Sequence, residues 1–291
     1  MRRIRFLILA FFIASTLFTA QYFIREHLAE DHTLPVITFD QDSIEVSVND
    51  PDTVLLQGVS AFDAKDGDLT GGIFIEGLSR FTEIGHRMIT YAAFDNDGHV
   101  VKNTREVVYT DYESPRFAMS QPMQFTQRET VDLLRGVTVT DCLDGDITYK
   151  IKAESSEGIE SAFGTQYDVT YSVSNAAGDT AVLPMTILVY DSTNPGNLKL
   201  NLTDYVVYMK KDSWLNPESY LKSFTFMNNE YQFGEPLNPE APEENQVSIT
   251  KSMVHVVSNV VNSEPGVYTI DYTLYTGSYN GTVSMTVVVE E

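Results

Sequence analysis

Two acidic turns contain the residues of this sequence best suited to bind an ion. Asp63, Asp66 and Asp68 lie in the stretch 63–70, and 141–148 repeats their spacing with Asp141, Asp144 and Asp146. Carboxylate oxygens are the ligands that Ca²⁺ prefers, and this ion takes about six to eight of them. The spacing is not that of an EF-hand loop, however, and aspartates also form turns by accepting hydrogen bonds from their own backbone, with Gly67 and Gly145 supplying the positive φ. Calcium binding and turn formation are both open at this point.

The acidic turns recur inside two segments that share one order of signals. Pro35 opens the first segment and Pro115 opens the second. Short runs such as 44–48 alternate apolar and polar residues, as half-buried strands do, and we expect a further strand over 54–61. Hairpin signals follow at 95–98 and 175–178. Short strands separated by turn signals at this spacing indicate an all-β sandwich in each segment.

The stretch 194–291 keeps only the end of this pattern. Pro265–Tyr272 and Ser284–Val289 match the last strands of the first two segments, but the Asp-Gly-Asp turn is missing. We expect an exposed loop over 228–246, which carries prolines and glutamates, and an extended segment over 210–221 in place of earlier strands. The only tryptophan, Trp214, is either an exposed recognition residue or a core residue between sheets.

The N-terminus predicts a membrane segment. Arg2, Arg3 and Arg5 precede an apolar run over 6–24, which as a helix rises about 28 Å, close to the thickness of a bilayer core. The positive-inside rule leaves the N-terminus in the cytoplasm and the rest outside. Cleavage after Ala20 would put a phenylalanine where a small residue is needed. We expect a retained single-pass anchor in the cell membrane, with secretion after signal cleavage as the alternative.

Composition narrows the class of protein. The 291 residues carry a net charge of −22, from 41 acidic and 19 basic residues, which argues against nucleic acid as a partner. Hydrophobic residues make up 43%, enough for packed cores. One cysteine, Cys142, permits no intrachain disulfide, which is unusual for a eukaryotic secreted module but ordinary for a bacterial surface protein.

The first two segments resemble the Ig-like repeats of bacterial surface proteins, which occur in tandem on adhesins, cell-wall proteins and some pesticidal crystal proteins. The resemblance rests on a shared order of residues: Gly58-Val59, Asp66-Gly67-Asp68-Leu69-Thr70, Gly85, Ile89-Thr90-Tyr91 and Asp95 to Gly98, with Gly136-Val137, Asp144-Gly145-Asp146-Ile147-Thr148, Gly164, Val169-Thr170-Tyr171 and Asn175 to Gly178 in the second segment. It implies tandem Ig-like β-sandwiches and a surface location, and it implies no particular ligand.

The expected organisation is therefore an all-β chain of tandem Ig-like β-sandwiches preceded by one N-terminal transmembrane helix. The four parts are 1–34 (cytoplasmic tail, signal-anchor helix and stalk), 35–113, 114–193 and a divergent third sandwich over 194–291.

In an Ig-like sandwich the acidic turn and the last hairpin lie at the same end. That placement predicts a Ca²⁺ site that stiffens the junction of the first and second sandwiches. Its candidate ligands are Asp63, Asp66, Asp68, Asp95, Asp97, Asp111, Glu113, Asp141, Asp144 and Asp146.

No enzyme motif stands out. The five histidines are scattered, and no nucleophile elbow or phosphate-binding glycine loop is present. We expect a protein that is not an enzyme and acts in adhesion, or in binding a surface protein or glycan. The alternative is a structural spacer or accessory subunit of a cell-envelope complex. Trp214 and the loop 228–246 are the candidate contact residues.

Overall fold

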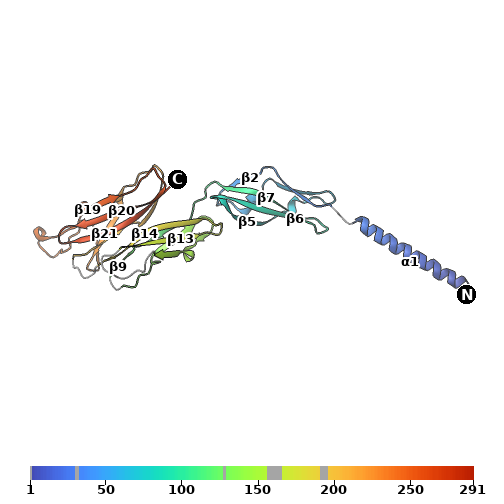
Figure 1. Ribbon diagram of the computed structural model, residues 1–291, viewed down its shortest axis with the longest axis horizontal. Coiled ribbons are helices and arrows are strands. Elements are labelled where there is room, and N and C mark those ends of the chain that lie inside the picture. Colours follow the sequence, from blue (N-terminus) through green and yellow to red (C-terminus); the bar gives the residue numbers. More distant parts are fainter. Residues whose placement is uncertain (1, 30–32, 127–128, 156–165, 191–195) are drawn as a thin grey trace. The chain divides into compact units, whose positions relative to one another are not determined.

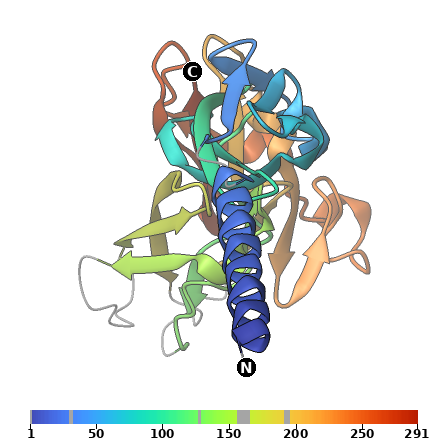
Figure 2. The same cartoon turned by 90° about the vertical axis from the view of Figure 1, so that its right-hand side faces the viewer.

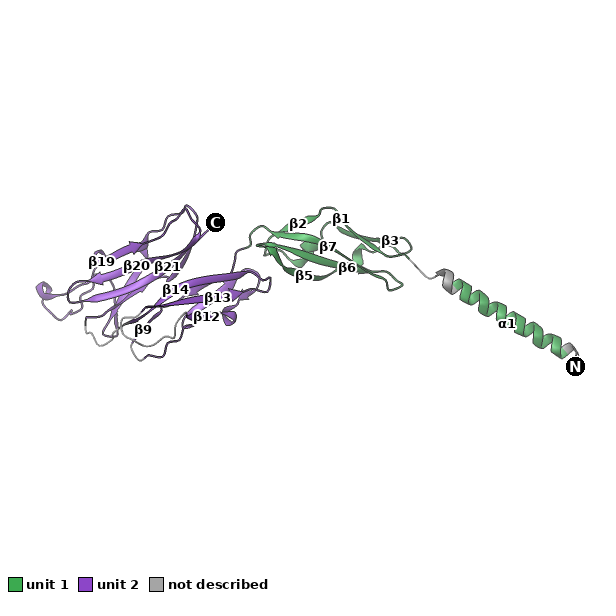
Figure 3. Ribbon diagram, in the orientation of Figure 1, with its two compact units in different colours: residues 1–112 green, residues 113–291 purple. Residues whose placement is uncertain are grey.

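The chain is all-β after an N-terminal helix, as the computed structural model shows for residues 2–29, 33–126, 129–155, 166–190 and 196–291 (Figure 1). It divides into two compact units, 1–112 and 113–291 (Figure 3). The first contains one Ig-like sandwich and the second contains two. Three sequence predictions lie outside the described residues: the end of the stalk at 30–32, Gly164, and the domain boundary between 193 and 194.

Helix α1 runs from Arg2 to Ala29. Its stretch Ile4–Arg25, 22 residues, is long and apolar enough to cross a membrane, and none of it is buried against the rest of the chain. Both membrane spans and signal sequences near an N-terminus have this length and composition. The expected apolar segment over 6–24 therefore lies inside one continuous helix.

Sandwich 1 pairs a three-stranded sheet, in the order β1-β3-β4, with a four-stranded sheet, β2-β7-β6-β5. Its strands are β1 (Val36–Phe39), β2 (Ser43–Val46), β3 (Val59–Asp63), β4 (Gly67–Asp68), β5 (Phe74–Glu83), β6 (His86–Phe94) and β7 (Val100–Tyr109), with short 3-10 helices η1 (Asp52–Leu56) and η2 (Thr70–Gly72).

Sandwich 2 repeats this plan with sheets β11-β10-β8 and β12-β13-β14-β9. Its elements are β8 (Arg116–Met119), β9 (Gln124–Thr126), β10 (Val137–Asp141), β11 (Gly145–Asp146), η3 (Thr148–Lys150), β12 (Lys152–Ser155), β13 (Gln166–Ser174) and β14 (Thr180–Tyr190).

Sandwich 3 has sheets β15-β17-β18 and β16-β21-β20-β19. Its elements are β15 (Lys199–Leu202), β16 (Val206–Lys210), η4 (Pro217–Tyr220), β17 (Leu221–Phe226), β18 (Asn229–Tyr231), η5 (Glu243–Asn245), η6 (Lys251–Met253), β19 (Val254–Ser258), β20 (Gly266–Tyr275) and β21 (Asn280–Glu290).

The opening strand of every sandwich is split between its two sheets. In sandwich 1, β1 pairs antiparallel with β3, and β2 then crosses over to pair parallel with β7. The same parallel pairing joins β9 to β14 and β16 to β21. The divergent stretch therefore has the same topology as the two regular repeats.

A buried tyrosine fixes the same internal bond in all three sandwiches. Tyr91, Tyr171 and Tyr272 are fully buried, and their hydroxyls donate to the backbone carbonyls of Leu55 (2.5 Å), Leu133 (2.7 Å) and Pro217 (2.9 Å). Each bond ties one strand of the four-stranded sheet (β6, β13 or β20) to the segment that crosses the end of the sandwich. Burial raises the pKa of Tyr171 to about 12, because the phenolate is poorly solvated there.

Two local predictions are wrong. We expected a strand over 54–61, but residues 52–56 form η1, and β3 begins only at Val59. We expected an extended segment over 210–221 in place of strands, but 211–216 is a loop followed by η4. Pro51 directly precedes η1, and Asn216 caps η4, which begins with Pro217; these residues favour turns over a ladder of backbone bonds.

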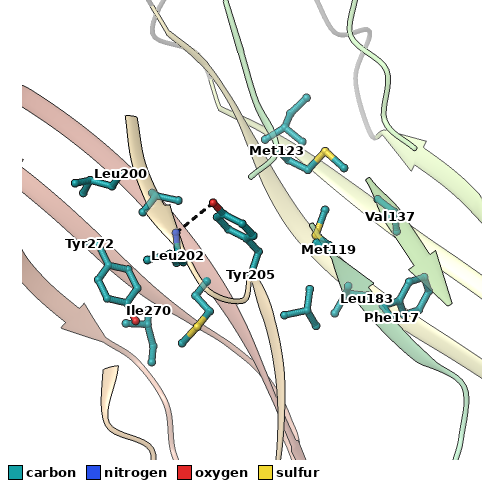
Figure 4. Close-up of a cluster of buried hydrophobic side chains, with 14 of the residues drawn as sticks. Phe117, Met119, Met123, Val137, Leu183, Leu200, Leu202, Tyr205, Ile270 and Tyr272 are labelled. Carbon is teal, nitrogen blue, oxygen red and sulfur yellow. Dashed lines mark hydrogen bonds between the residues drawn. The ribbon is translucent and has the colours of Figure 1, made fainter. Parts of the chain in front are cut away.

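The two sandwiches of the second unit share one hydrophobic core. Sandwich 2, green to yellow, and sandwich 3, orange to red, lie side by side in both views (Figures 1 and 2). Tyr205, 4% exposed, lies between Leu202 of sandwich 3 and the methionines Met119 and Met123 of sandwich 2 (Figure 4). The core of sandwich 1 is a separate cluster.

Candidate functional site

The acidic turn of sandwich 1 is held by its own backbone. Asp63, 1% exposed, accepts hydrogen bonds at Oδ1 from the amides of Lys65 (2.7 Å) and Asp66 (3.0 Å). Its Oδ2 accepts from the hydroxyl of Thr33 (3.2 Å). Gly67 has φ +77°, as turn formation predicts. A buried aspartate with three donors is a turn former whose carboxylate charge is already satisfied.

The neighbouring aspartates are engaged in the same way. Asp68 Oδ1 accepts from the amide of Thr70 (2.9 Å), and the bonds from Thr70 lower the pKa of Asp68. Lys65 Nζ lies 2.5 Å from Asp97. Burial raises the pKa of Asp95, but bonds from the amide (2.8 Å) and ring (2.6 Å) of His99 outweigh it, so the net shift is downward.

The turn also meets the last hairpin, as expected for an Ig-like sandwich. Asp66 accepts two hydrogen bonds from Asn96, one from the backbone amide and one from Nδ2, both 2.8 Å. The predicted convergence of 63–68 on 95–97 is therefore confirmed.

Sandwich 2 repeats this geometry. Asp141, 5% exposed, accepts from the amides of Leu143 (3.0 Å) and Asp144 (2.8 Å) and from Asn175 Nδ2 (3.0 Å). Asp144 accepts from the amide of Ala176 (2.7 Å). The predicted approach of this turn to the hairpin 175–178 is confirmed as well.

Further bonds occupy the outer carboxylates of this second turn. Asp144 Oδ2 also accepts from Lys150 Nζ (3.0 Å), and Asp146 Oδ1 accepts from the amide of Thr148 (2.9 Å). The bonds from Thr148 lower the pKa of Asp146.

Of the remaining two candidate ligands, one lies beside an acidic turn and one does not. Glu113 belongs to the second unit, and its backbone carbonyl accepts from Cys142 Sγ in the second acidic turn (3.1 Å), as predicted, while its carboxylate pairs with Arg116 (3.0 Å). Asp111 accepts from the hydroxyl of Ser47 (2.6 Å) and the amide of Val48 (2.8 Å), beyond the far end of β7. Since β7 has ten residues, Asp111 is about 30 Å from the hairpin that holds Asp95.

The ten candidate ligands thus divide into separate groups. Among the residues that the structure describes, no group of three or more His, Cys, Asp or Glu side chains is arranged to hold a metal ion. The hydrogen bonds favour turn formation, and calcium binding stays a prediction.

A cleft of 720 Å³ lies between the two sandwiches of the second unit. One wall is the outward face of β13 and β14, and the other is the outward face of β20 and β21. Each of these four strands has a hydrogen-bonded neighbour on both sides for part of its length; β9, for example, pairs with Leu188–Tyr190 of β14. The walls therefore present mainly side chains to a ligand. The volume is in the usual range of ligand sites, about 300–1,000 Å³.

Hydroxyls and carboxylates line the two walls. On the sandwich 2 wall, Asp168 Oδ1 accepts from the hydroxyl of Thr186 (3.2 Å), which lies opposite it in the strand register. On the sandwich 3 wall, Asp271 Oδ1 accepts from the hydroxyl of Ser284 (2.6 Å), again its cross-strand partner. No Lys or Arg is among the described residues that line this cleft.

The base of the cleft joins the two sandwiches. Gln124, 9% exposed, donates from Nε2 to the carbonyl of Thr282 (2.5 Å). Tyr205 lies beside it, and its carbonyl accepts from the amide of Thr286 (2.9 Å). The core residue Tyr205 and the buried side-chain amide of Gln124 thus fix the distance between the walls.

A smaller pocket of 270 Å³ continues from the cleft. Gln124, Leu188, Thr273 and Thr282 line both spaces. The pocket adds the apolar residues Leu198, Leu274 and Tyr275 and the polar residues Asn197, Lys199 and Asn280. Its wall depends on Gly281, because a Cβ there would lie 2.6 Å from the carbonyl oxygen of Leu198.

This cleft was not predicted from the sequence. The signal was present as alternating polar residues, such as Thr269, Asp271 and Thr273 on one strand. The same alternation is expected for any solvent-facing strand, so it did not distinguish a cleft wall from a plain surface.

The two contact residues chosen from sequence are exposed. Trp214 is 92% exposed, so of the two alternatives for it the core position is wrong. In the predicted loop 228–246, residues 229–231 form strand β18 instead, and most side chains of 232–246 are exposed. Backbone bonds such as Leu237 to Val247 (2.8 Å) brace this loop. Neither residue set lines the cleft.

Comparisons with known proteins give no family. No family model matches the chain, and no curated protein matches it. Among solved structures, it is similar to the CBM51-2 and INT domains of Clostridium perfringens ZmpB (33% identity, 26% of this chain and 16% of that one, TM-score 0.23). It is also similar to the protocadherin gammaB4 extracellular domain (12%, 89% and 49%, 0.21) and to mouse cadherin-23 EC22-24 (12%, 89% and 99%, 0.22).

The chain spans 16%, 31% and 42% of the three ZmpB structures that it matches. TM-scores this low carry no argument about the ligand or partner of this chain.

Proposed function

We propose that this chain is a non-catalytic binding protein of the bacterial cell surface, related to tandem Ig-like surface repeats, and that it takes its ligand in the cleft of the second unit. The cleft is the observation that carries the proposal. It is a side-chain-lined space of 720 Å³ between two sandwiches that share a core, and its polar side chains point inward from both walls. A rigid frame of this kind positions ligand-binding groups without a closing movement.

Helix α1 supports the proposed location. Arginines precede its apolar stretch Ile4–Arg25, which favours a cytoplasmic N-terminus and sandwiches outside the cytoplasm. The protein then stays in the membrane as a single-pass anchor. Recovery of the intact chain in carbonate-washed membranes, with the sandwiches digested by external protease on whole cells, is the expected result. A chain shortened at its N-terminus in the culture medium would instead indicate secretion.

The ligand site is tested with the full chain in lipid nanodiscs on arrays of surface glycans and extracellular proteins. The double variant Asp168→Ala/Asp271→Ala is expected to lose the captured ligand. The control Glu154→Ala/Glu243→Ala removes the same charge from exposed positions that do not line the cleft, and it should bind like the wild type. Equal capture by all three proteins would overturn the cleft as the site.

A structural spacer or accessory subunit is the second candidate. The shared core of the second unit favours it, because two sandwiches that cannot move apart form a stiff block. Copurification of the full chain with one membrane protein, unchanged in the cleft double variant, would support this role over ligand binding.

A further inference from the structure

We infer that the ligand of the cleft is a neutral oligosaccharide, and that the small pocket at the end of the cleft receives an apolar substituent of one sugar, such as the methyl of an acetamido group. The inference rests on the proposed function and adds the ligand class and its orientation.

The groups on the walls match a polyol. Asp168 and Asp271 each use one carboxylate oxygen to accept a neighbouring hydroxyl, and no residue that the structure describes donates to the other oxygen. Those oxygens are acceptors for O–H donors. The hydroxyls of Thr170, Thr269 and Thr273 both donate and accept. Sugar hydroxyls supply both kinds of partner at close spacing.

Charge and topology argue against other ligands. The described lining of the cleft has two carboxylates and no Lys or Arg, and the small pocket adds one lysine, Lys199, so the two carboxylates of the cleft disfavour phosphates, sulfated glycans and nucleic acids. An extended peptide binds best at a strand edge, where the backbone supplies the bonds. Here β13, β14, β20 and β21 each have neighbours on both sides for part of their length, so the walls offer mainly side chains.

The small pocket is more apolar than the cleft. Its accessible apolar side chains are the half-buried Leu188 and Tyr275, 76% exposed at the rim, with the buried Leu198 and Leu274 behind them and Lys199 beside them. Gln124 and Thr282 lie where the two spaces meet. A sugar seated across this boundary would place hydroxyls on the threonines and an apolar substituent against Leu188. A tyrosine ring at the rim also suits the apolar face of a sugar ring.

The test compares two neutral tetrasaccharides with the same linkage, cellotetraose and fully N-acetylated chitotetraose, by calorimetry on the full chain in nanodiscs. The acetylated sugar is expected to bind about five- to tenfold more tightly, which corresponds to the burial of about one to two methylene-sized groups. Asp168→Ala/Asp271→Ala should weaken both sugars more than tenfold, because both lose the carboxylate acceptors.

A second variant separates the inference from the proposed function. Lys199→Trp fills the pocket from an exposed position of β15 that does not line the cleft, so the fold should tolerate it. It should abolish the preference for the acetylated sugar while cellotetraose still binds. Lys222→Trp, the same change at an exposed position of β17 outside both spaces, is the control.

Three outcomes are informative. If the wild type binds the two sugars equally and the aspartate double variant binds neither, the small pocket does not receive an acetyl group. The cleft would then remain a glycan site. Tighter acetylated binding that Lys199→Trp does not change would also overturn the pocket. Absence of binding for both sugars, with an array protein captured through the cleft instead, would overturn the oligosaccharide while keeping the proposed site.

Discussion

Asp66 accepts two hydrogen bonds from Asn96, one from its backbone amide and one from its side-chain Nδ2, each 2.8 Å long. The two residues come from the acidic turn and from the hairpin between the last two strands of sandwich 1. In sandwich 2 the same contact is made by Asp144, which accepts from the amide of Ala176. The repeated aspartate therefore clamps two loops that are distant in sequence.

Removal of this clamp should cost stability. Asp66→Ala leaves the amide of Asn96 without its acceptor, and we expect the free energy of unfolding of the first unit to fall by about 1–2 kcal/mol. Calorimetric unfolding of the full chain measures the change. Asp42→Ala, an exposed aspartate outside the turn, is the control and should change stability by less than about 0.5 kcal/mol. Equal effects would show that the clamp is dispensable.

The engaged carboxylates also lead to an expectation about calcium. Because Asp63 and Asp141 already accept amide bonds, we expect the same melting temperature, within about 1 °C, in millimolar Ca²⁺ and in chelator. Scattering curves of the full chain should likewise not change. A clear rise in melting temperature with Ca²⁺, lost in Asp141→Asn, would support the calcium site predicted from the sequence.

Acid should destabilise the turns. Hydrogen bonds from Thr70 and Thr148 lower the pKa of Asp68 and Asp146 in the folded chain, relative to about 3.9 in an unfolded one. A lowered folded pKa adds stability above the unfolded value, and this stability is lost as the pH falls through the folded value. The melting temperature should therefore be flat from pH 7 to 5 and fall below about pH 4. The double variant Asp68→Asn/Asp146→Asn should show a shallower fall, and an identical profile would contradict this origin.

Sequence predicted these turns well because their information is local. Aspartate, glycine and threonine at fixed spacing specify both the turn and its bonds, and the period of two specifies the strands around it. The cleft has no such signature. Its walls meet because β13 and β20, about a hundred residues apart, belong to sandwiches that pack on a common core. Trp214 was ambiguous for a related reason, since no alternation in 211–216 assigns it a face.

Loss of the tyrosine hydrogen bond that all three sandwiches share should lower stability most in sandwich 3, which lacks the acidic turn of the other two. Tyr272→Phe keeps the ring but leaves the carbonyl of Pro217 without its donor, so we expect a loss of about 1–3 kcal/mol. Tyr275→Phe, on the same strand but 76% exposed, should cost almost nothing. Urea unfolding of both variants measures the difference. Equal stability would mean that water replaces the tyrosine as donor.

The second unit should unfold as one cooperative block, because Tyr205 joins its two sandwiches. Tyr205→Ala removes a ring that is 4% exposed and lies between Leu202 and Met123, and we expect a loss of about 3 kcal/mol. With the junction weakened, the single calorimetric transition should separate into two. Tyr149→Ala, 81% exposed in the same unit, is the matched control and should leave one transition. A wild-type unit that already melts in two steps would show that the shared core does not couple the sandwiches, and the walls of the cleft would then be free to move.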